Sequence, residues 1–121
     1  MRKKNYGGED METEKIKVII KRPDEKTGHM TWVSNTLKNL QSHVEGHIEV
    51  VKIGTSGLLM LCNEDGKNLC LEKNFMMGFV PFQDMIVGTV VLCGAGGEDF
   101  TDVPIDMKQW KYMLKLWGNA V

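Results

Sequence analysis

The segment GAGGEDF, residues 94–100, has residue types that could hold a phosphate, because its glycines follow an apolar run. A dinucleotide-binding loop needs glycine at the sixth position of G-x-G-x-x-G, where this chain has Asp99, and a P-loop needs Gly-Lys-Ser/Thr. Glu98 and Asp99 would also repel a phosphate at this turn. We therefore expect the loop to be structural and to turn the chain from a buried strand toward a terminal helix. Its motif residues are Gly97, Glu98, Asp99 and Phe100.

The other chemistry-bearing residues lack the spacing that metal binding or catalysis requires. His43 and His47 are four residues apart, but Gly46 interrupts any helix between them, and the three cysteines form no C-x-x-C pair. The serines have no recognisable nucleophile motif, and adjacent carboxylates such as Glu64 and Asp65 are typical of solvated turns. We therefore expect no catalytic residue, no metal, no cofactor and no enzymatic activity.

A second group of residues could contact a ligand, because polar and aromatic side chains flank the expected turns and loops. Amide, ammonium and carboxylate groups can line a pocket there, and aromatic rings can stack on a ligand or a partner. Ordinary turn chemistry and helix capping are the alternative explanation for the polar residues. The candidates are Trp32, Asn63, Lys67, Lys73, Asn74, Phe75 and Asp84, with Phe79 and Phe82 as further aromatic candidates.

Length and composition indicate one globular domain. A chain of 121 residues would leave two separate cores too small to bury most of their surface. The 42% hydrophobic and 26% charged residues are typical of a packed domain, and a net charge of -1 lacks the basic excess that attracts nucleic acid. Residues 1–14 carry mixed charges and few apolar side chains, so we expect a flexible tail before a single domain at 15–121.

The sequence also predicts a cytoplasmic protein. No window is long and apolar enough to span a membrane, and no basic segment precedes an apolar one as in a signal peptide. The cysteines are odd in number and lie inside apolar runs, which favours buried, reduced thiols over disulfides.

The first part of the chain predicts a hairpin followed by a helix. Lysine alternates with Ile and Val over 15–23, and 29–33 alternates again after a turn, so the first strand should have one wet face. Apolar residues recur at helical spacing over about 35–45, with Ser34 as the expected cap and Gly46 as the expected end.

The rest of the chain predicts a meander, a loop, a central strand and a second helix. We expect strands at 47–53 and 58–62, and a turn at 63–67 that leads into a third strand of the meander at 68–72. A loop should follow at 72–84, and then a nearly continuous buried strand at 85–93 with a bulge or close packing at Gly88. An amphipathic helix should lie between Pro104 and Gly118 and pack Trp110 and Trp117 inward. The expected fold is α+β, with a mostly antiparallel sheet of five or six strands and two helices.

Several stretches occur in an order that resembles a known family. It is a family of small proteins that phages and mobile elements encode, described as a domain of unknown function, and the resemblance covers residues 16–117. The family often has a Leu-Pro-x-Asn-Arg-like stretch, whereas LEKNF here keeps Asn74 and places Phe75 where the arginine would stand. The matching stretches are LKNLQSHVEGHIEVV (37–51), LCNEDGK (61–67), Asn74, DMIVGTVVL (84–92) and GEDF (97–100).

The resemblance implies a small accessory protein without an assigned reaction, and small phage accessory proteins often counter host defences. Two binding mechanisms fit. In the first, a homo-oligomer sequesters a nucleotide-like immune signal with asparagines, loop aromatics and Lys67 or Lys73. In the second, the protein inhibits a host defence protein by binding its flat or acidic surface. We prefer sequestration, because the polar candidates could line a pocket at a subunit boundary.

Overall fold

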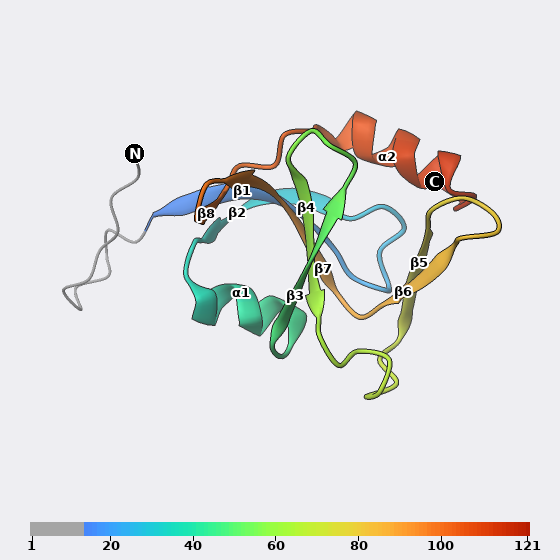
Figure 1. The fold of residues 1–121 in the computed structure, drawn as a ribbon, viewed down its shortest axis with the longest axis horizontal. Helices are drawn as coiled ribbons and strands as arrows, with labels where there is room; N and C mark the ends of the chain where they lie inside the picture. Colours follow the sequence, from blue (N-terminus) through green and yellow to red (C-terminus); the bar gives the residue numbers. More distant parts are fainter. Residues whose placement is uncertain (1–13) are drawn as a thin grey trace.

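The computed structural model describes residues 14–121, which form a single α+β domain (Figure 1). The large sheet is antiparallel throughout and has the strand order β2-β1-β7-β4-β3, with β8 paired to the end of β7. Strands β5 and β6 form a second, two-stranded sheet. The elements are β1 (Lys15–Lys21), β2 (His29–Ser34), α1 (Leu37–Val44), β3 (Ile48–Ile53), β4 (Leu58–Asn63), β5 (Lys73–Met77), β6 (Asp84–Val87), β7 (Val90–Gly96), β8 (Asp99–Thr101) and α2 (Met107–Leu116).

The large sheet separates two apolar clusters, with α1 on one face and α2 together with the β5–β6 hairpin on the other (Figure 1). Neighbouring residues of a strand point to opposite faces, so β1, β4 and β7 supply side chains to both clusters. The α1 cluster contains Ile16, Val18, Ile20, Val33, Leu40, Val44, Leu59, Leu61, Val91 and Cys93. The α2 cluster contains Ile19, Leu58, Met60, Cys62, Phe75, Ile86, Val90, Leu92, Val103, Trp110, Leu114 and Trp117.

The predicted fold class and the predicted hairpin of 15–23 with 29–33 are confirmed, and the first two strands of the predicted meander pair as β3 and β4. The expected wet face of β1 is wrong. β1 lies between β2 and β7, so both of its faces are covered over most of its length. Even Lys21 is only 3% exposed. Only the first lysines, Lys15 and Lys17, are exposed or half-exposed, at the start of β1. The alternation of lysine with apolar residues therefore does not indicate a solvent-exposed face of the strand.

The segment at 68–93 differs most from its prediction. Residues 64–70 form turns in place of a strand at 68–72, and the expected loop at 72–84 contains β5 and the start of β6. The expected strand at 85–93 is two strands in two different sheets. The break lies at Gly88, whose φ of 75° is unfavourable for other residues and where a Cβ would lie 2.8 Å from the Leu71 Cδ1.

Both ends of α1 also differ from the prediction. Thr36, and not Ser34, caps α1 by accepting a hydrogen bond from the Asn39 N–H. Glu45, and not Gly46, takes the left-handed conformation that ends α1, with φ of 63°. Gly46 is needed for space instead, because a Cβ there would lie 2.6 Å from the Asn63 Nδ2.

Helix α2 packs as predicted through Trp110, Leu114 and Trp117, which are all buried. Asp106 and Gln109 begin the helix with a reciprocal capping box, so Pro104 precedes the helix. The predicted stop at Gly118 is confirmed by a φ of 93° and by the hydrogen bond from its N–H to the Lys115 carbonyl.

Candidate binding cleft

A cleft of about 320 Å³ lies between the β3–β4 hairpin, the turn that follows β4, and the β5–β6 hairpin. Its floor is apolar and rich in methionine, and its rim is acidic. Three of the predicted ligand-contact residues, Asn63, Lys67 and Asp84, belong to it. The floor residues are Val51, Met60, Cys62, Met77, Met85, Ile86 and Val87, and the charged rim residues are Glu49, Glu64, Asp65, Lys67 and Asp84.

The floor is apolar because the sheet turns its α2 face toward the cleft. Met60, Cys62 and Ile86 are buried members of the α2 cluster, and Val51 and Met77 pack against it. Burial and the nearby carboxylates of Glu49 and Asp84 raise the pKa of the Cys62 thiol to about 11. At neutral pH the thiol is therefore uncharged and belongs to the apolar floor.

The rim carries four carboxylates and one ammonium group, which sum to a charge of -3. The Lys67 ammonium forms an ion pair with Asp84 across the cleft. The carboxylates of Glu49, Glu64 and Asp65 have no ion-pair partner among residues 14–121. The cleft is therefore suited to a cation and would repel a phosphate.

Asn63 lines the cleft but is buried and fully used by the fold. Its Nδ2 donates to the carbonyls of Val44 and Glu45 at 3.1 and 3.2 Å, and its Oδ1 accepts from the Asp65 N–H at 2.7 Å. This side chain therefore holds the end of α1 against the turn after β4. These bonds are the turn chemistry that the sequence offered as the alternative explanation for Asn63.

Asn74 lies outside the cleft and joins the two sheets. Its Nδ2 donates to the carbonyls of Lys21 and Gly88 at 2.9 and 2.7 Å, and its Oδ1 accepts from the Lys21 Nζ at 2.6 Å. The Lys21 Nζ also donates to the Glu25 carbonyl at 2.7 Å and lies 5.7 Å from the centre of the Phe75 ring. Burial lowers the pKa of Lys21, against the opposing influence of the Glu25 and Asp24 carboxylates.

Phe75 is a core residue, so its expected exposure for stacking on a ligand is wrong. Its ring is stacked on Trp117 at 6.2 Å and meets Trp110 edge-on at 5.5 Å. The physical reason is that residue 75 lies in β5 and not in a loop, on the side of the strand that faces α2. The neighbouring Lys73 is exposed at the start of β5 and does not line the cleft.

Trp32 is 57% exposed on β2, an edge strand at the opposite side of the large sheet from β3. Its ring centre lies 6.0 Å from the Lys17 ammonium, within the range of a cation–π contact. The structure therefore does not bring Trp32 together with the cleft residues.

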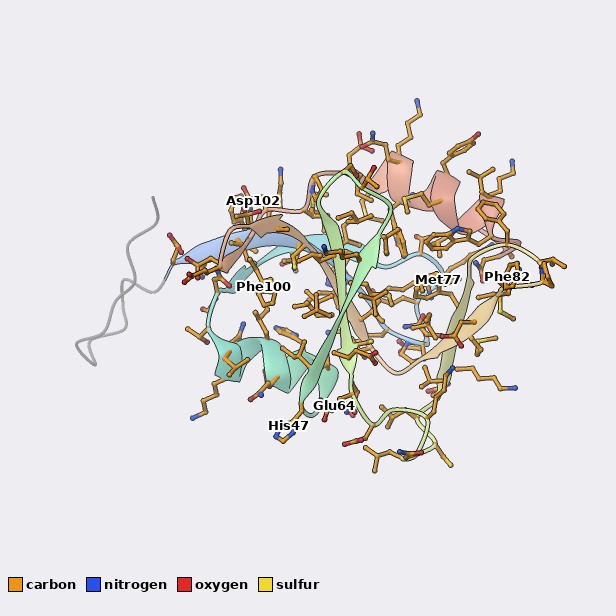
Figure 2. The ribbon with its side chains drawn as sticks, viewed as in Figure 1. His47, Glu64, Met77, Phe82, Phe100 and Asp102 are labelled. Carbon is orange, nitrogen blue, oxygen red and sulfur yellow. The ribbon has the colours of Figure 1, made fainter. Side chains whose placement is uncertain are left out.

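The GEDF motif is also remote from the cleft. Residues 94–100 form the β7–β8 hairpin, with Gly97 at a φ of 69° in its turn. The chain therefore passes through the short strand β8 before it reaches α2, which refines the expected direct turn. Figure 2 shows Phe100 at the opposite end of the molecule from Met77 and Phe82.

The loop between β5 and β6 forms an exposed aromatic tip, defined here as residues 78–83. Phe79, Val80 and Phe82 are 60%, 77% and 88% exposed. The Phe82 N–H donates to the Phe79 carbonyl at 2.7 Å, and the Gln83 Nε2 donates to the Trp117 carbonyl at 3.1 Å. These hydrogen bonds fix the conformation of the tip beside the end of α2. The predicted exposure of Phe79 and Phe82 is confirmed.

Sequence reasoning missed the methionines and Glu49 of the cleft. Met60 and Met77 are far apart in the chain and lie in segments with different predicted structures. One signal was available: alternation over 47–53 places Glu49 and Val51 on the same face of β3. The expectation of buried cysteines holds for Cys62 and Cys93 but is wrong for Cys70, which is exposed.

The scan against protein-family models matches residues 16–116 to the family described as Domain of unknown function (DUF3846). The chain belongs to the DUF3846 family. The match covers nearly the same residues as the resemblance found in the sequence, which had identified a domain of unknown function. For this DUF3846 member, the searches of curated proteins and of solved structures gave no match.

Two further findings concern the described residues of this DUF3846 protein. None of the helices formed by residues 14–121 is long and apolar enough to cross a membrane. In the same part of the chain, no group of three or more His, Cys, Asp or Glu side chains is arranged to hold a metal ion. The predicted tail, residues 1–14, lies outside this range except for Glu14, whose carbonyl accepts from the Asn35 N–H at 2.8 Å.

Proposed function

We propose that this DUF3846 protein is an accessory protein of phage or mobile-element origin that binds a host defence protein in the host cytoplasm. The aromatic tip is the contact surface, and its exposure is the observation that carries the proposal. The origin and the anti-defence role rest on the family resemblance, while the mode of action rests on the surface.

The tip has the properties of an interface anchor. Phe79, Val80 and Phe82 present three large apolar side chains to water within four residues. Aromatic side chains contribute strongly to protein–protein binding because each buries a large area at a small entropy cost. The hydrogen bonds from Phe82 and Gln83 hold the tip in place before binding, so less entropy is lost when a partner is bound.

The surface continues onto the exposed side of α2. Tyr112 and Leu116 are exposed there, and Leu116 immediately precedes Trp117, to which the tip is hydrogen-bonded. Lys108, Lys111 and Lys115 are exposed on the same helix, and α2 has no acidic residue. An apolar centre with basic residues beside it suits the acidic protein surface expected for an inhibitor's target.

Sequestration of a nucleotide-like signal has less support from the geometry. The side-chain amide groups of Asn63 and Asn74 donate hydrogen bonds to backbone carbonyls, and Phe75 is buried in the core. Lys67 lies in a cleft with four carboxylates, so the charged groups of the cleft sum to -3. A phosphate-bearing ligand would have to overcome this repulsion, so protein binding is the function we favour.

The test compares the partners of two matched variants in a bacterial host that carries defence systems. The tip variant Phe79→Ser/Phe82→Ser removes both exposed rings, and the control Trp32→Ser/Val50→Ser removes two exposed apolar side chains elsewhere. We expect a defence protein that copurifies with the wild type and the control to be reduced at least about tenfold with the tip variant, a loss of about 1.4 kcal/mol of binding. Equal recovery with both variants would exclude the tip as the contact.

A ligand-release assay tests the sequestration hypothesis directly. The protein is incubated with cyclic nucleotide and adenosine-derived signals, separated from unbound material and heat-denatured, and the supernatant is assayed. Intact ligand in the supernatant would support sequestration, and a chemically altered ligand would show an enzyme. A strictly monomeric mass by light scattering would count against an oligomeric sequestering protein.

A further inference from the structure

We propose that the cleft between the β3–β4 and β5–β6 hairpins is a docking groove for a basic, amphipathic segment of a partner protein. This inference deepens the proposed function, since it assumes that the partner is a protein, and it names the chemistry of a second contact. It uses a surface different from the aromatic tip.

The floor of the cleft suits apolar side chains of varied shape. Met60, Met77 and Met85 line it beside Ile86 and the uncharged Cys62 thiol. Methionine is flexible and polarizable, and it adapts to ligands of different shape. A volume of about 320 Å³ is at the small end for a ligand pocket and accommodates a few side chains of a peptide.

The rim selects a cation. Asp84 is paired with Lys67, so the carboxylates of Glu49, Glu64 and Asp65 provide the excess negative charge. A segment with lysine or arginine beside its apolar residues satisfies the rim and the floor together. An acidic segment or a nucleotide would meet like charges around an apolar surface, which disfavours both.

The cleft and the aromatic tip are continuous along one hairpin. Met77 and Asp84 line the cleft, and the tip is the loop that connects these two residues. Figure 2 shows Met77 and Phe82 at this hairpin. A protein bound at the tip is therefore within reach of the cleft, and this continuity favours a protein segment over a free small cation.

The test measures binding of three synthetic peptides by calorimetry at low and high salt. One is an amphipathic helix of Lys and Leu, the second replaces every Lys with Glu, and the third replaces every Leu with Ser. We expect binding of the Lys/Leu peptide alone, weakened by salt because exposed carboxylates contribute. Equal binding of the Glu/Leu or the Lys/Ser peptide, or no binding at all, would overturn the proposal.

A charge-reversal variant assigns the binding to the cleft. Glu64→Lys/Asp65→Lys reverses two exposed rim charges, and Asp24→Lys/Glu98→Lys makes the same change in net charge outside the cleft. We expect the rim variant to weaken Lys/Leu binding by at least about tenfold and the control to keep it within about twofold. Equal losses in both variants would show attraction to the overall charge and would also refute the groove. Circular dichroism establishes that both variants are folded.

The tip variant keeps the two proposals separate. Phe79→Ser/Phe82→Ser should bind the Lys/Leu peptide like the wild type, since neither ring lines the cleft. If the tip variant loses partner capture but the rim variant does not, the proposed function stands and the docking groove is wrong. If peptide binding depends on the rim while partner capture does not depend on the tip, the groove stands and the proposed tip contact fails.

Discussion

At the scale of single residues, Asn74 connects the large sheet to the small one. Its amide bonds to β1 through Lys21 and to Gly88, where the chain passes between the sheets. The same side chain gives the buried Lys21 ammonium one of its two hydrogen-bond acceptors. A buried charge that loses such a partner is costly, so Asn74 has a structural role in this fold.

We predict that Asn74→Ala lowers the free energy of unfolding by about 3 kcal/mol, because it removes three hydrogen bonds and leaves buried polar groups without partners. Urea denaturation followed by circular dichroism measures the change. Asn68→Ala is the control, since Asn68 is exposed in the turn after β4, and it should change stability by less than about 0.5 kcal/mol. Similar values for the two variants would contradict the proposed role of Asn74.

At the scale of elements, Gly88 ends β6 and lets β7 enter the large sheet. The residue has a φ of 75°, and a Cβ at this position would lie 2.8 Å from the Leu71 Cδ1. Gly54 has a similar φ of 70°, but a Cβ there would meet no atom within 4 Å. The two glycines therefore separate the cost of backbone conformation from the cost of a steric clash.

We predict that Gly54→Ala costs about 1 kcal/mol from backbone strain alone and that Gly88→Ala costs about 1 kcal/mol more. Thermal and urea unfolding of both variants measure these values. Adding Leu71→Ala to Gly88→Ala should recover the extra loss, because it removes the atom that clashes. A Gly88→Ala protein no less stable than Gly54→Ala would show that Leu71 simply moves aside.

At the scale of the whole molecule, one sheet is shared by two cores. Ile19 and Leu92 point toward α2, while Ile20 and Val91 on the same strands point toward α1. Neither face can lose its packing without exposing strands that the other face needs. The charges are separated in space as well, since α2 carries exposed lysines and the cleft carries an excess of carboxylates, although the whole chain has a net charge of only -1.

We predict that the domain unfolds in a single cooperative transition. In a Trp32→Phe variant, tryptophan fluorescence comes only from Trp110 and Trp117 in the α2 cluster, whereas far-ultraviolet circular dichroism reports on both faces. The two signals should give the same denaturation midpoint in urea. A fluorescence midpoint clearly below that of circular dichroism would show that α2 and the β5–β6 hairpin unfold before the α1 face.

Much of the fold could be read from local pattern. The alternation at 29–33, the helical spacing of the two amphipathic segments and the stop at Gly118 depend on side chains close together in the chain, and these elements were predicted correctly. For Asn63, Lys67 and Asp84, the sequence predicted only that they lie beside turns and loops. It did not predict that they surround one cleft. Their hydrogen bonds and ion pair decide which of them are available to a ligand, and these depend on distant partners.

Local periodicity was sufficient to predict the α+β class, the antiparallel pairing and the inward packing of Trp110 and Trp117, because it encodes which side of an element is apolar. Long-range packing determines that 85–93 divides between two sheets, that Phe75 is in the core, and that Met60, Met77 and Glu49 meet in one cleft. The sequence pattern of an apolar run is the same whether the run forms one strand or two. Contacts between β3, β4 and β5–β6 join residues that no local pattern relates.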